Sequence, residues 1–260
     1  MPPGASKAGG RRPAGARLDQ RLVELGLAPT RSRAEALIRA GRVLVDDVPV
    51  EKPGARVALA ARVRVRGETR RFASRGGEKL AGALEDLAID PAGRRCLDLG
   101  ASTGGFTDCL LQAGARAVVA VDVGYGQLDP RLRQDPRVRV LERTNARHLE
   151  AAQLGGPVDL ATLDLSFISL RLVLPRLREI APEAEAIALV KPNFEVGRDR
   201  VGKGGVVRDE RLRAEAVRAV REAAVALGYS VAGEAQSRLA GPRGNREVFL
   251  WLRPSSGGSR

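Results

Sequence analysis

CLDLGASTGGFT, residues 96–107, decides the fold of most of this chain. It reads as a short apolar strand, then a glycine-rich turn with Gly100, Gly104 and Gly105, then the start of a helix. Such a turn lets the backbone approach a bound ligand closely. Ser102 stands where the dinucleotide fingerprint G-x-G-x-x-G needs its second glycine, so the turn does not favour a pyrophosphate ligand.

Short apolar segments alternate with helical ones on both sides of this turn. A helix is expected at residues 78–88, before the first strand. The predicted strands are CLDLG, AVVAVD, VRVLE, VDLATLD, EAIALVK and EVFLWL. This alternation is typical of an α/β fold, and it predicts a Rossmann-like, doubly wound parallel sheet.

Acidic and amide side chains at the ends of the first three strands indicate which nucleoside the sheet binds. The carboxylate of Asp98, just before the turn, suits the ammonium of a methionine moiety. Asp122 ends the second strand and suits two ribose hydroxyls, while Asn145 follows the third strand, where an adenine contact is expected. The predicted cofactor is therefore S-adenosylmethionine, with no metal. The expected contacts are Asp98, Gly100, Ser102, Gly104, Gly105, Phe106, Asp122 and Asn145. A purely structural glycine turn is the alternative.

A second, smaller pattern occupies residues 17–66. A helix from Leu18 ends at Gly26, and Ser32 followed by Glu35 indicates a capping box for a second helix. A hairpin is expected around Asp46-Asp47, with further strands after it. This segment is expected to form a small α+β domain.

Positive charge is concentrated at the front of the chain. The whole sequence has a formal charge of +13, and residues 1–72 carry 16 Lys+Arg against 7 Asp+Glu. A protein this basic usually binds a polyanion, so we expect RNA contacts mainly in this part. The expected RNA-binding residues are Arg17, Arg31, Arg33, Arg39 and Arg42. A solvated helix face is the alternative for these arginines.

Lysine is rare, because only 5 of the 44 cationic residues are lysines. Lys191 closes a predicted strand and Lys79 lies on the helix before the sheet; Lys can lose its proton where Arg cannot. Asp164 ends another strand and Glu247 begins the last one. We expect neutral Lys191 to accept the proton of a ribose 2′-hydroxyl, helped by repulsion from Lys79, with the two carboxylates orienting the lysines. Ordinary salt bridges at the rim of the sheet are the alternative.

Long motifs connect these residues to a known family. They are SRGGEKL, LDLGASTGGFT, VDVGYGQL, LERTNAR, DLSFISL, LVKPNFEVG, GGVVRD and GNREVFLWL. From about Arg17 to Arg253 the chain resembles the TlyA family of ribosomal RNA 2′-O-methyltransferases, whose catalytic domain is of the FtsJ type. The resemblance implies an S4-type RNA-binding domain at the front and a catalytic tetrad of Lys79, Asp164, Lys191 and Glu247. It also implies methylation of a cytidine ribose in ribosomal RNA, with rRNA or ribosomal subunits as partner.

Two other functions remain as alternatives. Some members of the family are named haemolysins, yet no apolar run in the sequence is long enough to span a bilayer, so we expect no stable membrane insertion. A non-catalytic RNA-binding or ribosome assembly factor would be expected to lack the tetrad or the glycine turn. A base methyltransferase would carry Asn/Asp-Pro-Pro-aromatic where residues 164–167 read Asp-Leu-Ser-Phe.

The remaining features fix the expected organisation. Cys96 and Cys109 lie in apolar surroundings, which indicates buried free thiols of a reduced compartment, the cytoplasm. The expected parts are a disordered basic arm (1–16), an RNA-binding domain (17–66), a connector (67–77), a methyltransferase domain (78–253) and a flexible tail (254–260).

Overall fold

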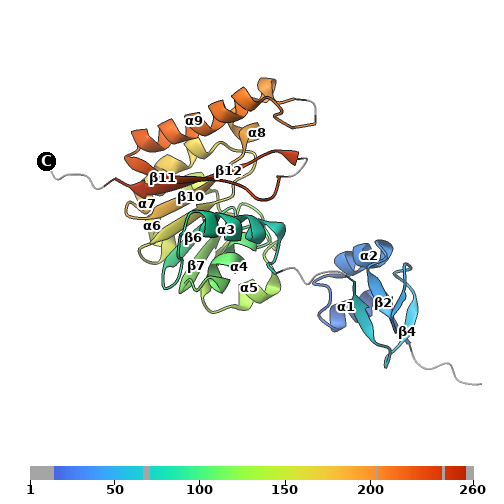
Figure 1. The fold of residues 1–260 in the computed structure, drawn as a ribbon. Helices are drawn as coiled ribbons and strands as arrows, with labels where there is room; N and C mark the ends of the chain where they lie inside the picture. Colours follow the sequence, from blue (N-terminus) through green and yellow to red (C-terminus); the bar gives the residue numbers. More distant parts are fainter. Residues whose placement is uncertain (1–14, 67–70, 203, 242–243, 256–260) are drawn as a thin grey trace, which may run out of the picture. The chain divides into compact units, whose positions relative to one another are not determined.

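The chain forms two compact units that divide between Thr69 and Arg70, each described here by itself (Figure 1). The structure is a computed structural model that describes residues 15–66, 71–202, 204–241 and 244–255. Most of the expected basic arm (1–14) and of the expected tail (256–260) lie outside the described residues.

The amino-terminal unit is the small α+β domain that the sequence predicts. Its elements are β1 (Gly15–Arg17), α1 (Leu18–Glu24), α2 (Arg31–Arg39), β2 (Val43–Val45), β3 (Val48–Pro49), β4 (Arg56–Ala58) and β5 (Val63–Val65). Leu18 and Leu22 of α1 pack against Ala34 and Ile38 of α2 in its core. The helical spacing of these apolar residues explains why both helices form here.

Two local predictions for this unit need correction. The structured domain includes residues before the expected start at Arg17, because Gly15 pairs with Ala58 across β1 and β4. The cap of α2 is Thr30, whose hydroxyl accepts a hydrogen bond from the backbone N–H of Arg33, and not Ser32. Thr30 has the extended backbone that a capping residue requires.

The hairpin at Asp46-Asp47 is confirmed. Both residues have positive φ, 48° and 66°, as the tightest hairpin turn requires. The turn is held from the neighbouring strand: Asp46 accepts the backbone N–H of Arg62, and Asp47 forms an ion pair with Arg64. The negative charge of the turn is thus partly balanced within the domain.

The second unit alternates helices and strands. Its strands are β6 (Arg95–Leu99), β7 (Ala117–Val121), β8 (Val138–Leu141), β9 (Leu160–Leu163), β10 (Glu185–Val190), β11 (Tyr229–Gln236) and β12 (Val248–Pro254). Its α-helices are α3 (Arg75–Asp86), α4 (Gly105–Gln112), α5 (Pro130–Gln134), α6 (Ala151–Leu154), α7 (Leu174–Ile180), α8 (Pro192–Glu195) and α9 (Glu210–Ala226), with short 3-10 turns η1 (Ala146–His148), η2 (Leu170–Leu172) and η3 (Arg198–Arg200).

These strands form one seven-stranded sheet in the order β11-β12-β10-β9-β6-β7-β8. The Rossmann-like α/β fold is confirmed, but the sheet is not wholly parallel. Strand β12 lies between β10 and β11 and runs antiparallel to both. The sequence did not show this, because an apolar strand has the same composition in either direction and its orientation depends on the connection that precedes it.

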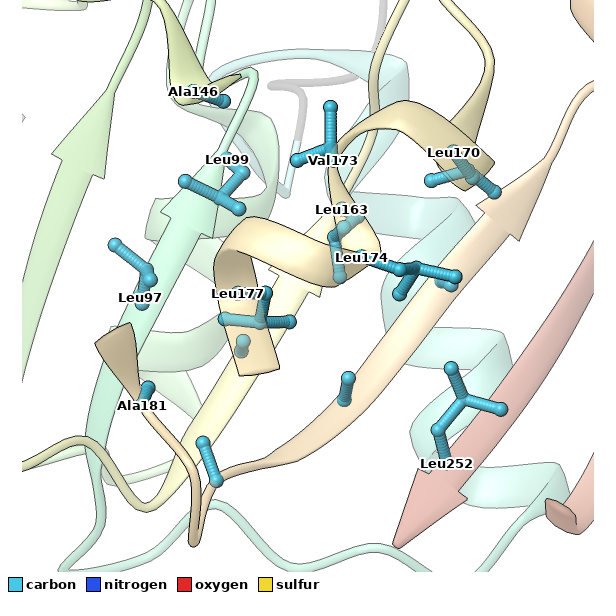
Figure 2. Packing of buried hydrophobic residues seen from close by; sticks show 14 of the residues in the cluster. Leu97, Leu99, Ala146, Leu163, Leu170, Val173, Leu174, Leu177, Ala181 and Leu252 are labelled. Carbon is cyan, nitrogen blue, oxygen red and sulfur yellow. The ribbon is translucent and has the colours of Figure 1, made fainter. Parts of the chain in front are cut away.

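Each face of the sheet is covered by helices. Leu97 and Leu99 of β6 point to the face covered by α7. Cys96, directly before Leu97, points to the opposite face, which α3 and α4 cover. Figure 2 shows Leu174 and Leu177 of α7 over the strands that carry Leu97 and Leu163. Burying a leucine in such a core contributes about 1.5–3 kcal/mol.

The second unit starts earlier than the expected boundary at residue 78. Phe72 is buried in the core beside α3, so it is not part of a solvated connector. Helix α3 begins at Arg75, because the hydroxyl of Ser74 accepts the backbone N–H of Gly76 and caps it. The Ser-Arg-Gly-Gly segment is therefore the cap and first turn of the helix.

Candidate active site

The glycine-rich turn after β6 forms one wall of a cavity of about 460 Å³. Gly100, Ser102, Asp122 and Asn145 line it, as expected for the cofactor residues. Its other lining residues include Val123, Gln127, Thr144, Ile168 and Val173. A cavity of this size with apolar walls and a few polar groups is typical of a nucleoside site.

Asp122 and Asn145 keep hydrogen-bonding capacity for a ligand. The two oxygens of Asp122 accept the backbone N–H groups of Ser102 (2.8 Å) and Gly124 (2.7 Å), so they hold the turn beside the strand. A carboxylate has about four lone-pair sites, and two remain for ribose hydroxyls. The Asn145 oxygen accepts the backbone N–H of Arg147, which leaves its amide NH₂ free to donate.

Asp98 does not have the expected direct role. It is fully buried and lines neither this cavity nor its neighbour. Its oxygens accept the hydroxyls of Thr107 (2.7 Å) and Thr162 (3.0 Å). Side chains alternate along a strand, and Asp98 therefore points into the layer between β6 and α4 rather than out of the sheet's edge.

The glycines of the turn serve close packing within the protein more than contact with a ligand. Gly100 has φ 91°, and a Cβ there would lie 2.6 Å from the carbonyl oxygen of Asp164. A Cβ on Gly105 would lie 2.9 Å from the backbone nitrogen of Gly77, so Gly105 allows α4 to approach α3. Gly104 packs against Leu132 and lines neither this cavity nor its neighbour with the two lysines, whereas Gly105 and Phe106 border that neighbouring cavity.

The second cavity, of about 450 Å³, contains both candidate catalytic lysines. Lys79 reaches it from α3 and Lys191 from the end of β10, and it shares Gly100, Ser102 and Asp164 with the first cavity. The two cavities are therefore contiguous. A ligand in the first can present a group to the lysines in the second.

Each lysine has its own carboxylate partner. Nζ of Lys79 donates to Oε2 of Glu247 at 2.5 Å, and both side chains are buried. Nζ of Lys191 lies 2.6 Å from Oδ1 of Asp164, as an ion pair without hydrogen-bond alignment, and donates to the hydroxyl of Ser166 at 3.0 Å. The expected repulsion between the lysines is offset, because each positive charge is balanced.

The antiparallel direction of β12 explains how Glu247 reaches this site. In the register of β10 and β12, Val190 pairs with Val248. Lys191 directly follows β10 and Glu247 directly precedes β12, so both lie at the same end of this strand pair. If β12 ran parallel to β10, Glu247 would lie at the opposite end.

A third cavity, of about 500 Å³, adjoins the lysine site and contains aromatic residues that the sequence reasoning missed. Phe167 is 90% exposed and has φ 68°, and its ring lies 5.4 Å from that of Phe194. Lys191 and Glu247 line the same cavity. The available signal was the Phe in each of the motifs DLSFISL and LVKPNFEVG, because each follows the end of a predicted strand, where open α/β sheets bind their ligands.

The candidate RNA-binding arginines of the small domain divide into two groups. Arg17 and Arg31 both pair with the buried carboxylate of Asp19, and the Arg17 guanidinium holds the pKa of that carboxyl well below its usual range. Arg39 pairs with Glu35. The side chains of Arg17, Arg31 and Arg39 are still 40%, 53% and 66% exposed, so part of each guanidinium faces solvent.

Arg33 and Arg42 form the second group of these arginines, which have no carboxylate partner among the described residues. Arg33 is exposed on α2, and Arg42 donates through Nε to the carbonyl oxygen of Arg66. All five arginines therefore keep N–H groups that a phosphate can reach.

The cysteines have the expected state. Cys96 and Cys109 are free and buried, and burial raises the pKa of both thiols to about 12. Within the described ranges, no helix is long and apolar enough to cross a membrane. The described residues also contain no group of three or more His, Cys, Asp or Glu arranged to hold a metal.

The strand order of the sheet is that of a Rossmann-like fold, and the two lysine–carboxylate pairs lie at the ends of its strands. Comparison with known families agrees with this fold and defines the class of the protein. The FtsJ-like methyltransferase family matches residues 72–254, and an S4 domain matches residues 16–63. The chain belongs to the FtsJ-like methyltransferase family, as the resemblance implied.

Within that family the chain is similar to the TlyA proteins. It is 55% identical to the 16S/23S rRNA (cytidine-2′-O)-methyltransferase TlyA of Mycobacterium tuberculosis, over 92% of this chain and 90% of that protein. It is 35% identical to Hemolysin A of Brachyspira hyodysenteriae, over 90% of this chain and 98% of that one. A solved structure from Streptococcus thermophilus, labelled a candidate hemolysin, has 39% identity and a TM-score of 0.72, over 93% of this chain and 89% of that one.

Proposed function

We propose that this protein transfers a methyl group from S-adenosylmethionine to the 2′-hydroxyl of a ribose, most simply of a cytidine, in ribosomal RNA. One observation carries the proposal: two lysine–carboxylate pairs face a cavity that opens directly into a nucleoside-sized cavity. The TlyA relative of Mycobacterium tuberculosis supplies the substrate class.

The residues of the first cavity fit the cofactor. The spare lone pairs of Asp122 suit the two ribose hydroxyls of an adenosine, and the free amide NH₂ of Asn145 suits a ring nitrogen. Bound S-adenosylmethionine would supply an electrophilic methyl group. The shared wall at Gly100 and Asp164 supports a pose in which the methionine end points toward the lysines.

Lys191 is the proposed base. A ribose 2′-hydroxyl is a weak nucleophile until its proton is removed. Once the Lys191 ammonium has released a proton to solvent, its neutral amine can accept the proton of the hydroxyl. The ammonium that forms then lies beside the carboxylate of Asp164, which stabilises the developing charge, while Ser166 fixes the direction of Nζ. Lys79, held by Glu247, orients the ribose from the other side.

The aromatic cavity and the small domain would position the RNA. A nucleobase turned out of its strand can stack on the exposed ring of Phe167, next to Lys191. The S4 domain, with Arg17, Arg31, Arg33, Arg39 and Arg42, would contact phosphates of rRNA or of a ribosomal subunit in the cytoplasm.

The test maps 2′-O-methyl groups in the 16S and 23S rRNA of a bacterium that lacks its own enzyme. Wild-type protein should add a methyl group at a cytidine ribose. Lys191→Arg should lower the rate at least about 100-fold, because Arg keeps the charge but cannot act as a base. Calorimetry with S-adenosylmethionine should show nearly unchanged binding.

Lys52→Arg is the matched control, since Lys52 lies in the small domain and its charge is preserved. It should leave the rate unchanged. Substantial turnover by Lys191→Arg would exclude lysine as the base, and methyl groups found on a nucleobase would contradict the proposed reaction.

A further inference from the structure

A further hollow of the catalytic unit, of about 780 Å³, lies between α9 and the strands β11 and β12, which Figure 1 shows side by side. One face of α9 lines it, through Glu210, Arg213, Ala214, Val217, Arg218 and Arg221. The opposite side includes Glu234, Arg246 and Val248. The sequence predicted no RNA contact at these residues.

This hollow begins where the catalytic site ends. Pro192 lines it and directly follows Lys191, while Val248 lines it and directly follows Glu247. Ala240 lines both the hollow and the cavity that contains the two lysines. A polymer with one nucleotide at the lysines can therefore continue into the hollow.

The charges in the hollow leave a positive excess. Two of the four arginines are neutralised, because Arg213 pairs with Glu210 and Arg221 pairs with Glu234. Arg218 lies 3.8 Å from its nearest carboxylate, with its side chain 68% exposed. An exposed pair at this distance contributes little.

Arg246 is the other available cation. It is exposed and forms no ion pair with any residue that the structure describes. Val217, Val248 and Pro192 give the hollow an apolar floor between these two arginines. One guanidinium with only a weak, exposed partner and one without an ion pair among the described residues, both beside apolar surface, suit a phosphodiester backbone with its sugars. Guanidinium binds phosphate through paired hydrogen bonds.

We propose that this hollow binds the RNA strand flanking the target nucleotide, with Arg218 and Arg246 contacting its phosphates. The inference rests on the proposed function, because the strand is the one whose ribose reacts at Lys191. It adds a phosphate-binding surface on the catalytic unit itself, which is separate from the arginines of the small domain.

The experiment compares two double variants that remove equal charge. Arg218→Ala with Arg246→Ala changes the hollow. Arg116→Ala with Arg211→Ala is the control. Arg116 directly precedes β7, which lies on the far side of the sheet from β11 and β12, and Arg211 is on α9 but does not line the hollow. The probe is unmodified rRNA from ribosomal subunits of cells that lack the protein.

The hollow variant should raise KM for this RNA roughly tenfold, with kcat nearly unchanged. The slope of log affinity against log salt concentration should become shallower by about 1.4 to 1.8, as expected for two lost phosphate contacts. The control variant should match wild type in KM. Affinity for S-adenosylmethionine and the thermal midpoint confirm that both variants are folded.

Equal KM values for the two double variants would overturn the inference, even if wild type methylates the RNA. So would a hollow variant that changes the oligomeric state in light scattering without changing RNA affinity, since the hollow would then bind a second copy. If the alanine variant misfolds, Arg218→Lys with Arg246→Lys replaces it. That variant keeps both positive charges, so its affinity for RNA should depend on salt as in wild type. It should still bind more weakly, because Lys cannot make the two parallel hydrogen bonds that Arg makes to a phosphate. Failure of wild type to methylate the RNA would instead contradict the proposed function.

Discussion

Asp98 is a buried acid whose ionised form is costly where it lies. Burial raises its pKa to about 7, against hydrogen bonds from Thr107 and Thr162 that favour the ionised form. The native protein therefore holds a proton here that the unfolded chain has released between about pH 4 and 7. The free energy of unfolding falls across this range, and the cost is complete above pH 7.

Asp98→Asn should remove this cost. An amide can accept one threonine hydroxyl and donate to the other oxygen, so both hydrogen bonds have a replacement. We expect the variant to be more stable than wild type at pH 8, by an amount on the order of a few kcal/mol, and equal to it below about pH 4. Denaturant unfolding at both pH values measures the difference. A difference that does not change with pH would show that ionisation of Asp98 is not its source.

Helix α8 links the two loops that carry the site, through one buried residue. Glu195 accepts the hydroxyl of Ser169 at 2.5 Å and the backbone N–H of Leu170 at 2.8 Å. These two residues continue the loop that carries Ser166 and Phe167, while α8 itself starts directly after Lys191. Glu195 thus fixes the distance between the loops after β9 and β10.

Glu195→Ala should lower the free energy of unfolding by about 1–3 kcal/mol, because it leaves a buried N–H without a partner. It should also raise KM for RNA more than it lowers kcat, since the loop and its aromatic ring lose their support. Glu195→Gln should recover most of both, because its amide oxygen can accept the N–H of Leu170 and its NH₂ can donate to the hydroxyl oxygen of Ser169. Glu179→Ala, which breaks an exposed pair with Arg176, is the control and should change stability little. Equal KM values for Glu195→Ala and the control would exclude a positioning role.

At the scale of the whole molecule, the chain consists of two units with separate cores. The first, with 14 Lys+Arg against 7 Asp+Glu, carries +7 of the total +13. Phe72 belongs to the core of the second unit, so the boundary between the two units lies before Phe72. The S4 domain and the methyltransferase match are also divided at this place.

Removal of residues 1–69 should leave a folded unit that binds S-adenosylmethionine but methylates rRNA poorly. Its affinity for RNA should depend less steeply on salt than that of the full chain, because fewer phosphate contacts remain. Removal of residues 1–72 should in addition destabilise the unit by about 3–5 kcal/mol, through the loss of Phe72. Calorimetry, thermal unfolding and salt titration measure these effects. Equal salt slopes for the full and shortened chains would show that the small domain is not the main RNA-binding part.

The sequence by itself determined the class of fold and proposed most residues of the candidate site. The spacing of apolar residues set the helices and strands, and the glycine-rich turn after CLDLG set the type of sheet, because both depend on neighbours along the chain. The rarity of lysine singled out Lys79 and Lys191, and the strand ends singled out Asp164 and Asp122.

Only the tertiary structure decided how these residues are paired and which of them face a ligand. The direction of β12, the pairing of Lys79 with Glu247 and the burial of Asp98 all depend on segments far apart in sequence. The same holds for the exposure of Phe167 beside Phe194. A pattern along the chain records which residues are apolar or charged, but a side chain's surroundings are set by packing between elements. That is why the residue types of the site could be predicted and its partners could not.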